Sequence, residues 1–293
     1  MVHEYESFDK ALQKICGEGC FLAEKRPVFG GDINDAFRLT MSDGTVLFMK
    51  SNNIRSYDNF KAEAEGLSAI RDTGAIGVPP ILGMGKEGDR SFLLLGYVSG
   101  ESRKKDYWET FAGELADMHI AGISGNGMYG FARNNYIGSN SQVNDWHSSW
   151  VSFFRECRLQ PQLNMASTYF SSADRKRFDH LLSHLDNYLI EPGRPSLLHG
   201  DLWSGNMITG NDGKGWLIDP AVYYGHPEAD IAMTELFGGF SYRFYGAYRE
   251  RGLMENGYED RRDIYNLYHL LNHLNLFGGG YLSSVIRILK HYT

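Results

Sequence analysis

Three features that often identify a protein are scarce in this 293-residue sequence: long hydrophobic runs, clusters of basic residues and pairs of cysteines. No apolar stretch approaches the roughly 18 residues that a membrane-spanning helix needs, so the sequence predicts no membrane partner. The cysteines are three in number, and Cys16 and Cys20 have no second pair with which to hold zinc. Reduced cysteines and the lack of an apolar leader at the N-terminus favour a cytoplasmic location.

The charge of the chain argues against a nucleic-acid partner. The formal net charge is −7, and only two short basic runs occur. A protein that binds nucleic acid normally presents a basic face. Aromatic residues are abundant, at 14%, and include Tyr223, Tyr224, Tyr242 and Tyr245. Such side chains fill a core or line a pocket, and the sequence leaves that choice open.

The first third of the chain predicts a small layer of strands and helices. The Ser-Asp-Gly turn at 42–44 suits a hairpin, and the Pro-Pro pair at 79–80 interrupts the helical pattern. Strands and helices in this order form an α+β layer. We expect helices at 5–16 and 58–73, and strands at 26–39, 45–50, 81–85 and 91–98.

After Ser99-Gly100 the pattern becomes mostly helical, with no internal repeat and no low-complexity linker. The sequence therefore predicts an α+β, two-lobed protein, with a small β-rich lobe at 1–98 and a larger, mostly helical lobe at 99–293. In the larger lobe we expect helices at 107–120, 144–166, 173–190 and 261–277, and short strands at 196–199, 206–209 and 215–218.

The most informative segment is His-Gly-Asp-Leu-Trp-Ser-Gly-Asn at 199–206, followed by Leu-Ile-Asp-Pro at 217–220. Phosphoryl transfer from ATP needs a carboxylate to accept the proton of the acceptor hydroxyl, and hard oxygen ligands for Mg²⁺. Asp201 suits the first role, and Asn206 and Asp219 suit the second. The Asp-x4-Asn spacing matches the catalytic loop of protein kinases.

These residues also have a plainer interpretation, because Gly, Asp and Asn favour turns on their own. The His-Gly that precedes Asp201 and the apolar strand that leads to Asp219, 18 positions downstream, favour the catalytic interpretation. A protein kinase is the weaker option, since no Ala-Pro-Glu ends an activation segment after Asp219.

The first lobe offers groups that suit a nucleotide. Gly30 and Gly31 lie between two expected strands, where a glycine turn brings backbone N–H groups to phosphates, although most such turns are ordinary hairpins. Lys50 ends an apolar strand where kinases place a phosphate-binding lysine, and Glu63 on the next helix is its expected partner. Glu65 competes for this role, but the helical period places Glu63 toward the inner face.

The strand at 91–98 is expected to lead into the hinge between the lobes. Backbone groups of Gly96, Tyr97 and Val98 can pair there with an adenine ring, so the identity of their side chains matters little. We therefore predict a protein-kinase-like fold with ATP and Mg²⁺ as cofactors. The lobe at 1–98 is expected to bind the nucleotide, and the lobe at 99–293 to carry catalysis and the substrate.

Five segments together resemble the fructosamine kinase, or ketosamine-3-kinase, family. They are 199–206, 219–230, 235–240, 268–273 and 30–37, and the resemblance covers nearly the whole chain. His-Gly-Asp alone indicates only an aminoglycoside-phosphotransferase-like protein, whereas the Trp within 199–206 and the whole of 219–230 narrow the resemblance to this family. It implies ATP- and Mg²⁺-dependent phosphorylation of the O3 hydroxyl of a ketosamine, a sugar joined to an amine by glycation. The product is unstable and releases the amine, so the implied activity is deglycation repair.

Carried over by position, the resemblance implies that Asp201 is the base and that Asn206 and Asp219 hold the metal. Lys50 and Glu63 become the pair that positions the phosphates.

The resemblance also bears on two single residues. It implies that Trp203 packs against the sugar or against the carbon chain of the amine. In the family the glycine loop can carry a redox-sensitive cysteine, whereas here Asp32 stands at the nearest position. Regulation through a disulfide at that loop is therefore in doubt.

Other polar residues have two interpretations each. His226, Glu228 and Asp230 contact the substrate, or they build a loop and the start of a helix, where acidic residues are favoured. His269 and His273 lie one helical turn apart. That spacing suits a metal pair or, without a third ligand, a packed pair.

Two other functions stay open. One is a kinase for another small hydroxyl compound, such as an aminoglycoside or choline, and the other is a nucleotide-binding module without catalysis. The joint presence of Lys50, Asp201, Asn206 and Asp219 argues against the second. The expected partners are ATP and a glycated amine, free or on a protein. The preference between ribulosamine and fructosamine and the oligomeric state are left open.

Overall fold

The computed structural model describes residues 2–29 and 34–293, so the expected phosphate-loop residues Gly30 and Gly31 lie outside the described residues. The chain divides into two compact units. The first unit is Met1–Tyr107 with Met207–Pro220, and the second is Trp108–Asn206 with Ala221–Thr293. This division differs from the expected one at residue 98, because a later segment that contains Asp219 returns to the first unit.

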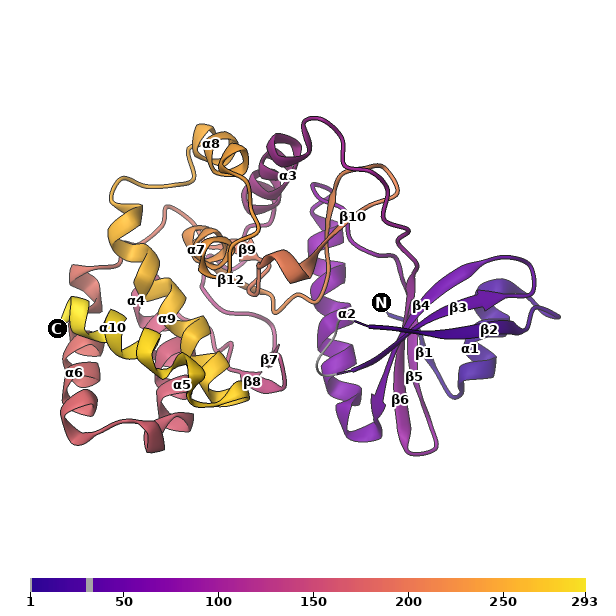
Figure 1. Cartoon of the computed structure of the whole chain (residues 1–293), viewed down its shortest axis with the longest axis horizontal. Helices are drawn as coiled ribbons and strands as arrows, with labels where there is room; N and C mark the ends of the chain where they lie inside the picture. The colour runs from indigo at the N-terminus through magenta and orange to yellow at the C-terminus, as the bar shows by residue number, and fades with distance from the viewer. Residues whose placement is uncertain (1, 30–33) are drawn as a thin grey trace. The chain divides into compact units, whose positions relative to one another are not determined.

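The first unit is built on a six-stranded sheet with the order β1-β5-β6-β4-β3-β2 (Figure 1). Neighbouring strands are antiparallel, except that β1 and β5 are parallel. The elements of this unit are β1 (Glu4–Tyr5), α1 (Phe8–Cys16), β2 (Leu22–Val28), β3 (Asp35–Met41), β4 (Val46–Asn53), η1 (Ile54–Ser56), α2 (Tyr57–Asp72), β5 (Ile81–Glu87), β6 (Arg90–Gly96), β10 (Met207–Thr209) and β11 (Gly215–Leu217).

The two faces of the sheet are covered by different helices. Successive residues of a strand point to opposite faces. Leu47 and Met49 of β4 pack with Ala11 and Leu12 of α1 on one face. Lys50 therefore points to the opposite face, where α2 packs against β5 and β6. This alternation is the reason why the ammonium group of Lys50, which follows four apolar residues of β4, lies on the α2 side.

The hairpin of β10 and β11 packs against the first unit through one tryptophan. The N–H of Leu217 donates to the carbonyl oxygen of Gly77 at 2.8 Å. A Cβ atom on Gly77 would lie 2.5 Å from Cδ1 of Trp216, so this close approach requires glycine. Asn211 Oδ1 also accepts from the N–H of Ser99 at 2.9 Å. Sequence order alone had assigned this hairpin to the larger lobe.

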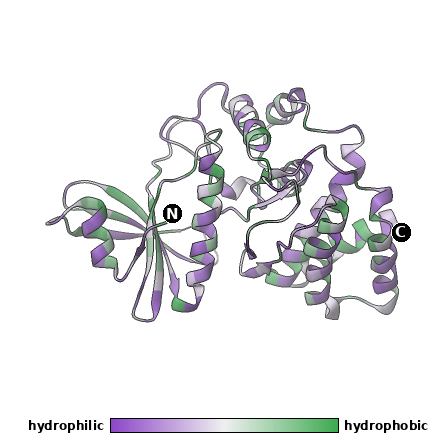
Figure 2. Cartoon of the chain, turned by 180° about the vertical axis from the view of Figure 1, so that it is seen from behind, coloured by the Kyte–Doolittle hydropathy of each residue, from purple (hydrophilic) through white to green (hydrophobic). Residues whose placement is uncertain are grey.

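The second unit is mostly helical and contains two small sheets, β7–β8 and β12–β9. Hydrophobic and polar residues alternate along its helices in Figure 2, as expected of helices with one buried face. Across the described residues, no helix combines the length and the apolar character needed to cross a bilayer. The elements are α3 (Tyr107–Ala121), β7 (Asn135–Ile137), β8 (Asn140–Gln142), α4 (Trp150–Phe153), η2 (Phe154–Leu159), α5 (Gln160–Met165), η3 (Ser167–Tyr169), α6 (Ser172–Ser183), η4 (Leu185–Asn187), β9 (Ser196–Leu198), η5 (Ser204–Asn206), β12 (Tyr223–Gly225), α7 (Glu228–Leu236), α8 (Tyr242–Glu250), α9 (Tyr258–Phe277), η6 (Gly279–Tyr281) and α10 (Leu282–Tyr292).

The helix predicted at 144–166 starts six residues later, because the residues before Trp150 pair with another segment. The carbonyl oxygen of Asn144 accepts from the N–H of Phe131 at 3.0 Å. The helix then begins at Trp150, whose N–H donates to the Glu191 carboxylate at 2.7 Å. The ladder widens at η2 into a π-helical turn. The strands β7, β8 and β12, of three residues each, were not predicted.

Candidate active site

One ammonium group is shared by two carboxylates in the first unit. Nζ of Lys50 lies 2.8 Å from Oε1 of Glu63 and also forms an ion pair with Asp219. The ion pair predicted between Lys50 and Glu63 is therefore present. The Lys50 side chain is 10% exposed and that of Glu63 13%, whereas that of Asp219 is 44% exposed. Asp219 is the member of this cluster that is open to a ligand.

Electrostatics keep Lys50 positively charged within this cluster. Burial acts to lower the pKa of Lys50, but the charges of Asp219 and Glu63 outweigh it and raise the pKa above its usual range. Burial raises the pKa of Glu63 to about 7, because Lys50 offsets only part of that effect and Asp219 adds to it. Lys50 thus stays positively charged at neutral pH, as an anionic ligand requires.

The backbone of Asp219 is unusual. Among the described residues, Asp219 is the one non-glycine residue with a positive φ, at 53°. The left-handed region costs an ordinary residue about 1 kcal/mol. Such strain persists where the surrounding structure holds a residue in place, and it is often found at functional sites.

A second polar pair lies in the second unit, in the segment 199–206. Nδ2 of Asn206 donates to Oδ2 of Asp201 at 2.9 Å and to the carbonyl oxygen of Asp201 at 2.8 Å. No hydrogen bond from the described residues reaches Oδ1 of Asn206. An amide oxygen of this kind is a hard ligand that suits Mg²⁺. The described residues contain no group of three or more His, Cys, Asp or Glu that could hold a metal.

The buried carboxylate of Asp230 on α7 fixes the start of the segment 199–206 through two hydrogen bonds. It accepts from the N–H of His199 at 2.7 Å and from the N–H of Gly200 at 2.9 Å. Nε2 of His119 on α3 lies 3.2 Å from the same carboxylate, and Nδ1 of His119 lies 2.7 Å from the hydroxyl of Tyr248. Burial acts to raise the pKa of Asp230, but the hydrogen bonds and the charge of His119 outweigh it and lower the pKa. Asp230 therefore stays ionised and fixes the backbone before Asp201.

The loop is also held close to the residue that follows Pro220. The N–H of Ala221 donates to the carbonyl oxygen of His199 at 2.8 Å. Gly200 has a φ of 81°, and a Cβ atom there would collide with the carbonyl oxygen of Ala221. Glycine is therefore required at this position.

A buried amide network fixes the carbonyl groups of Ala221 and Val222. Nε2 of Gln142 donates to the carbonyl oxygen of Ala221 at 2.9 Å, and Nδ2 of Asn135 donates to that of Val222 at 2.8 Å. Gln142 also donates to Oδ1 of Asn135 at 2.7 Å and accepts from the hydroxyl of Tyr268 at 2.6 Å. The hairpin β7–β8, which supplies both amides, therefore acts as a support for the segment after Pro220.

A buried arginine completes this network. Arg158 from the π-helical turn donates to Oδ1 of Asn144 at 2.8 Å, and Asn144 donates to Oδ1 of Asn135 at 2.8 Å. The Arg158 guanidinium lies 3.8 Å from the ring centre of Tyr223. Sequence reasoning missed Arg158, Gln142 and Asn135. Their polar side chains gave no signal of burial, because only the packing of distant segments places them in the interior.

Trp203 is half open to solvent, as expected of a residue that contacts a substrate. Its side chain is 38% exposed, and its ring centre lies 6.2 Å from that of Phe237 in an edge-to-face arrangement. A Cβ atom on Gly205 would lie 2.7 Å from Cζ3 of the indole, so glycine lets the ring fold back over its own loop.

His226 and Glu228 lie in the interior. Both carboxylate oxygens of Glu228 accept from Arg261, at 2.7 and 2.8 Å. Nδ1 of His226 accepts from the N–H of Glu228 at 3.2 Å. Both side chains are at most 1% exposed. This position favours the interpretation as a helix start, and it gives no support to the prediction that these two residues contact substrate.

The remaining candidates separate by exposure. His269 is buried, and its carbonyl oxygen lies 2.8 Å from Nδ1 of His273, which favours a packed pair. Tyr223 fills the interior, whereas Tyr242 is 84% exposed.

The expected adenine-contacting segment follows β6. The N–H of Gly96 donates to the carbonyl oxygen of Pro80 at 2.8 Å, so that group is engaged within the unit. Tyr97 and Val98 are half-buried. Their contact with adenine stays a prediction.

Comparison with known proteins gives a consistent result over the whole chain. Residues 4–293 match the family model described as fructosamine kinase. A probable ketoamine kinase of Synechocystis sp. is 36% identical over 296 residues, which cover 98% of this chain and 96% of the relative. The chloroplastic protein-ribulosamine 3-kinase of Arabidopsis thaliana is 39% identical over 271 residues, which cover 90% of this chain and 81% of the relative.

A solved structure shares the fold. The crystal structure of a candidate fructosamine-3-kinase from Haemophilus somnus 129PT has a TM-score of 0.87 and 31% sequence identity. The match covers 98% of this chain and 96% of that chain. The predicted fold class is thereby confirmed.

Acid should destabilise the protein through His226. Burial lowers the pKa of His226 from 6.5 to about 4, so the unfolded chain takes up a proton before the folded chain does. Stability is therefore fully present above pH 6.5 and is lost as the pH falls toward 4. One such group contributes about 3 kcal/mol over this range, at 1.36 kcal/mol per pKa unit. His226→Asn should make the loss shallower in urea titrations at pH 4, 5, 6 and 7. The exposed His291→Asn is the control, and an unchanged slope in His226→Asn would contradict the assignment.

Loss of one donor from the buried amide network should increase local opening of the backbone at 221–224. Gln142→Met leaves the carbonyl oxygen of Ala221 without its side-chain donor, and we expect amide exchange at 221–224 to rise about tenfold or more. Gln162→Met is the matched control, because Gln162 is as buried as Gln142 and bonds Asn272 instead. Each variant should cost a few kcal/mol, on the order of the penalty for unsatisfied buried groups. Equal exchange at 221–224 in the two variants, measured by mass spectrometry, would refute the support role.

Proposed function

Because this chain belongs to the fructosamine kinase family, we propose that it transfers the γ-phosphate of ATP to the O3 hydroxyl of a ketosamine. The observation that carries the proposal is the pairing of Lys50 with Glu63 and Asp219, together with the pairing of Asp201 with Asn206. These five side chains are the groups that phosphoryl transfer requires, and they occur in a chain that matches the family over nearly its full length.

Each residue has a distinct role in the proposed reaction. Asp201 accepts the proton of the O3 hydroxyl, and the hydroxyl oxygen attacks the γ-phosphorus as the bond to the leaving ADP oxygen breaks. The proton passes from Asp201 to solvent after transfer. Asp230 keeps Asp201 in position through the backbone of the preceding residues. Trp203 packs against the sugar or against the carbon chain of the amine.

The nucleotide is bound by separate groups. Lys50 offers its charge to the phosphates, and Glu63 holds Lys50 in place. Asn206 and Asp219 would hold Mg²⁺, which neutralises phosphate charge and aligns the transferring group. The backbone of 96–98 would pair with adenine, and Gly30 and Gly31 would approach the phosphates. The proposal thus assigns most of the nucleotide binding to the first unit. It assigns catalysis and acceptor binding to the second unit, which also supplies Asn206.

The biological consequence is part of the same proposal. Phosphorylation at O3 makes the ketosamine unstable, so the amine is released and glycation is reversed. Two relatives carry names that fit this activity, a ketoamine kinase and a ribulosamine 3-kinase. A cytoplasmic location, where free sugars and amines meet, belongs to the proposal as well.

Turnover should require a ketosamine, ATP and Mg²⁺ together. Purified protein is assayed for ADP release with a panel of ribulosamines and fructosamines, and with an aminoglycoside and choline for comparison. Asp201→Asn should lower kcat by about 10²- to 10⁴-fold, the usual contribution of a general base, and should still bind nucleotide in calorimetry. Asp179→Asn, an exposed change on α6, is the control. Absence of turnover with every ketosamine would overturn the substrate assignment.

The role of the Lys50–Glu63 ion pair in ATP binding can be tested with two variants on α2. Glu63→Gln removes the carboxylate that holds Lys50, and we expect the KM for ATP to rise about tenfold, as for loss of one charge-assisted hydrogen bond. Glu65→Gln is the matched control on the same helix and should change the KM less than about twofold. Equal effects of the two variants would show that Glu63 has no special role.

A further inference from the structure

One surface of the second unit carries aromatic rings that the rest of the chain leaves uncovered. Trp203, Phe237 and Phe277 are 38%, 40% and 53% exposed. Half-buried His273 and Tyr281 lie among them. We call these five residues the aromatic platform. Large exposed apolar groups that gather in one place usually mark a binding surface.

The rings form one continuous row. The ring centre of Phe237 lies 6.2 Å from that of Trp203 and 4.8 Å from that of His273. His273 in turn lies 5.5 Å from Phe277 and 5.1 Å from Tyr281. The row therefore starts two residues after Asp201 and extends to the end of α9 and to η6.

Glycines hold the separate segments of the platform together. A Cβ atom on Gly239, whose φ is 98°, would lie 2.5 Å from Cβ of Ser204. The turn after Phe237 therefore packs directly on the catalytic loop. Gly278, with a φ of 86°, ends α9 and lets the chain turn so that Tyr281 returns to His273.

The chemistry of the platform suits one positive charge on a carbon chain. The faces of aromatic rings attract cations. Nδ1 of His273 pairs with the carbonyl oxygen of His269 and must donate to it, which leaves Nε2 as an acceptor. Burial lowers the pKa of His273, so its ring stays neutral. Within 2–29 and 34–293, His273 makes no other hydrogen bond.

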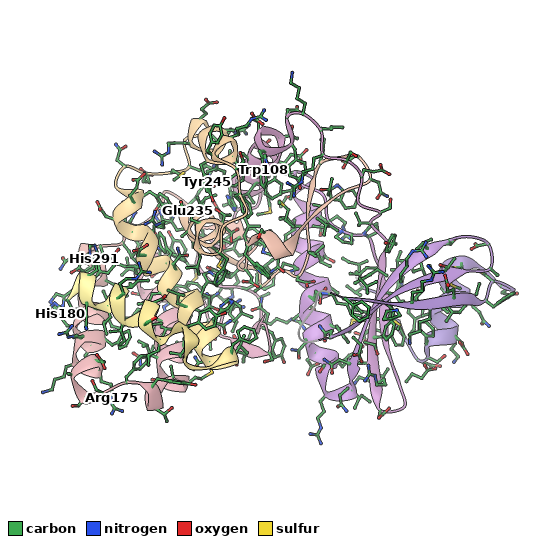
Figure 3. All side chains as sticks on the ribbon, viewed as in Figure 1. Trp108, Arg175, His180, Glu235, Tyr245 and His291 are labelled. Carbon is green, nitrogen blue, oxygen red and sulfur yellow. The ribbon has the colours of Figure 1, made fainter. Side chains whose placement is uncertain are left out.

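The platform lacks the carboxylates that a polycation would need. No carboxylate is among the described contacts of its five side chains. Glu235, two residues before Phe237 and labelled in Figure 3, is already bonded to the hydroxyl of Tyr258 at 2.7 Å and to Arg262 at 3.0 Å. An aminoglycoside carries several ammonium groups, whereas the ketosamine of a simple monoamine carries only one.

We propose that the aromatic platform binds the amine portion of the ketosamine, and that it selects amines with an apolar or aromatic carbon chain over small polar or polycationic amines. The inference rests on the proposed function, because it places the sugar beside Asp201 and Trp203. The amine portion then extends over Phe237 toward Phe277 and Tyr281. The secondary ammonium lies over the rings and donates to Nε2 of His273.

The test uses one sugar and several amines. Ribulosamines, or fructosamines if these turn over faster, are made from 2-aminoethanol, 1,4-diaminobutane, hexylamine and benzylamine. We expect kcat/KM to be about 10- to 100-fold higher for the hexylamine and benzylamine derivatives than for the 2-aminoethanol and 1,4-diaminobutane derivatives. This ratio is on the order of the binding free energy that a few buried methylene groups contribute. Phe237→Ser and Phe277→Ser should each reduce this preference to within about threefold, because kcat/KM falls less for the aminoethanol derivative than for the hexylamine and benzylamine derivatives. Phe21→Ser, at an exposed phenylalanine of the first unit, is the control and should keep the full preference.

Three outcomes would overturn the inference. The first is an undiminished preference in both platform variants, and the second is an equal loss with every amine. The third is a platform variant that changes the oligomeric state in analytical ultracentrifugation, which would make the platform an interface between copies of this chain.

A separate measurement distinguishes failure of the proposed function. If no ketosamine turns over, the proposed function fails, but calorimetry with the benzylamine derivative still tests the platform. Binding to the wild type and Phe21→Ser, and weakening of at least about tenfold in Phe277→Ser, would support it. Equal affinity in all three proteins would refute it.

Discussion

The buried carboxylate of Asp230 is the constraint on which the proposed catalytic loop, the segment 199–206, depends. A loop that precedes a catalytic aspartate has backbone N–H groups that regular structure does not satisfy, and these cost free energy when buried without partners. Asp230 accepts two of them, from His199 and Gly200, while His119 keeps the carboxylate ionised. The proposed base, Asp201, therefore follows a backbone that is fixed by a charge rather than by a strand or helix ladder.

Buried backbone carbonyl groups need hydrogen-bond partners as well, and this need explains the role of the hairpin β7–β8. Its amide side chains bind the carbonyl groups of Ala221 and Val222, directly after the strained Asp219. Left-handed backbone at an aspartate is unfavourable unless the flanking residues are held. The network, together with Pro220, holds them. The buried side chains of Gln142, Asn135 and Arg158 thus form a network that holds the residues directly after Asp219, a proposed metal ligand.

The aromatic platform gives the proposed kinase a means to choose its acceptor. Sugars offer hydroxyl groups that are alike from one ketosamine to the next, so discrimination has to use the amine portion. A row of rings that begins in the segment 199–206 provides apolar contact surface for a carbon chain, and its ring faces attract one positive charge. Its lack of carboxylates among the described contacts separates this surface from one built for polycationic antibiotics. The selectivity is therefore assigned to a row of rings that runs from Trp203, close to the proposed base in the sequence, to the end of α9 and to η6.

The sequence alone determined the fold class and the helix and strand of the first unit that carry Glu63 and Lys50, and it singled out the segment 199–206 as the candidate catalytic loop. These features depend on local period and on short spacing, both of which one sequence displays. The interior positions of His226, Glu228, Gln142 and Arg158 and the return of β10–β11 to the first unit were decided only by tertiary structure. A polar side chain becomes buried when segments far apart in the chain supply its partners, as Arg261 does for Glu228. Single-sequence patterns do not contain that information, because they describe neighbours along the chain and not neighbours in space.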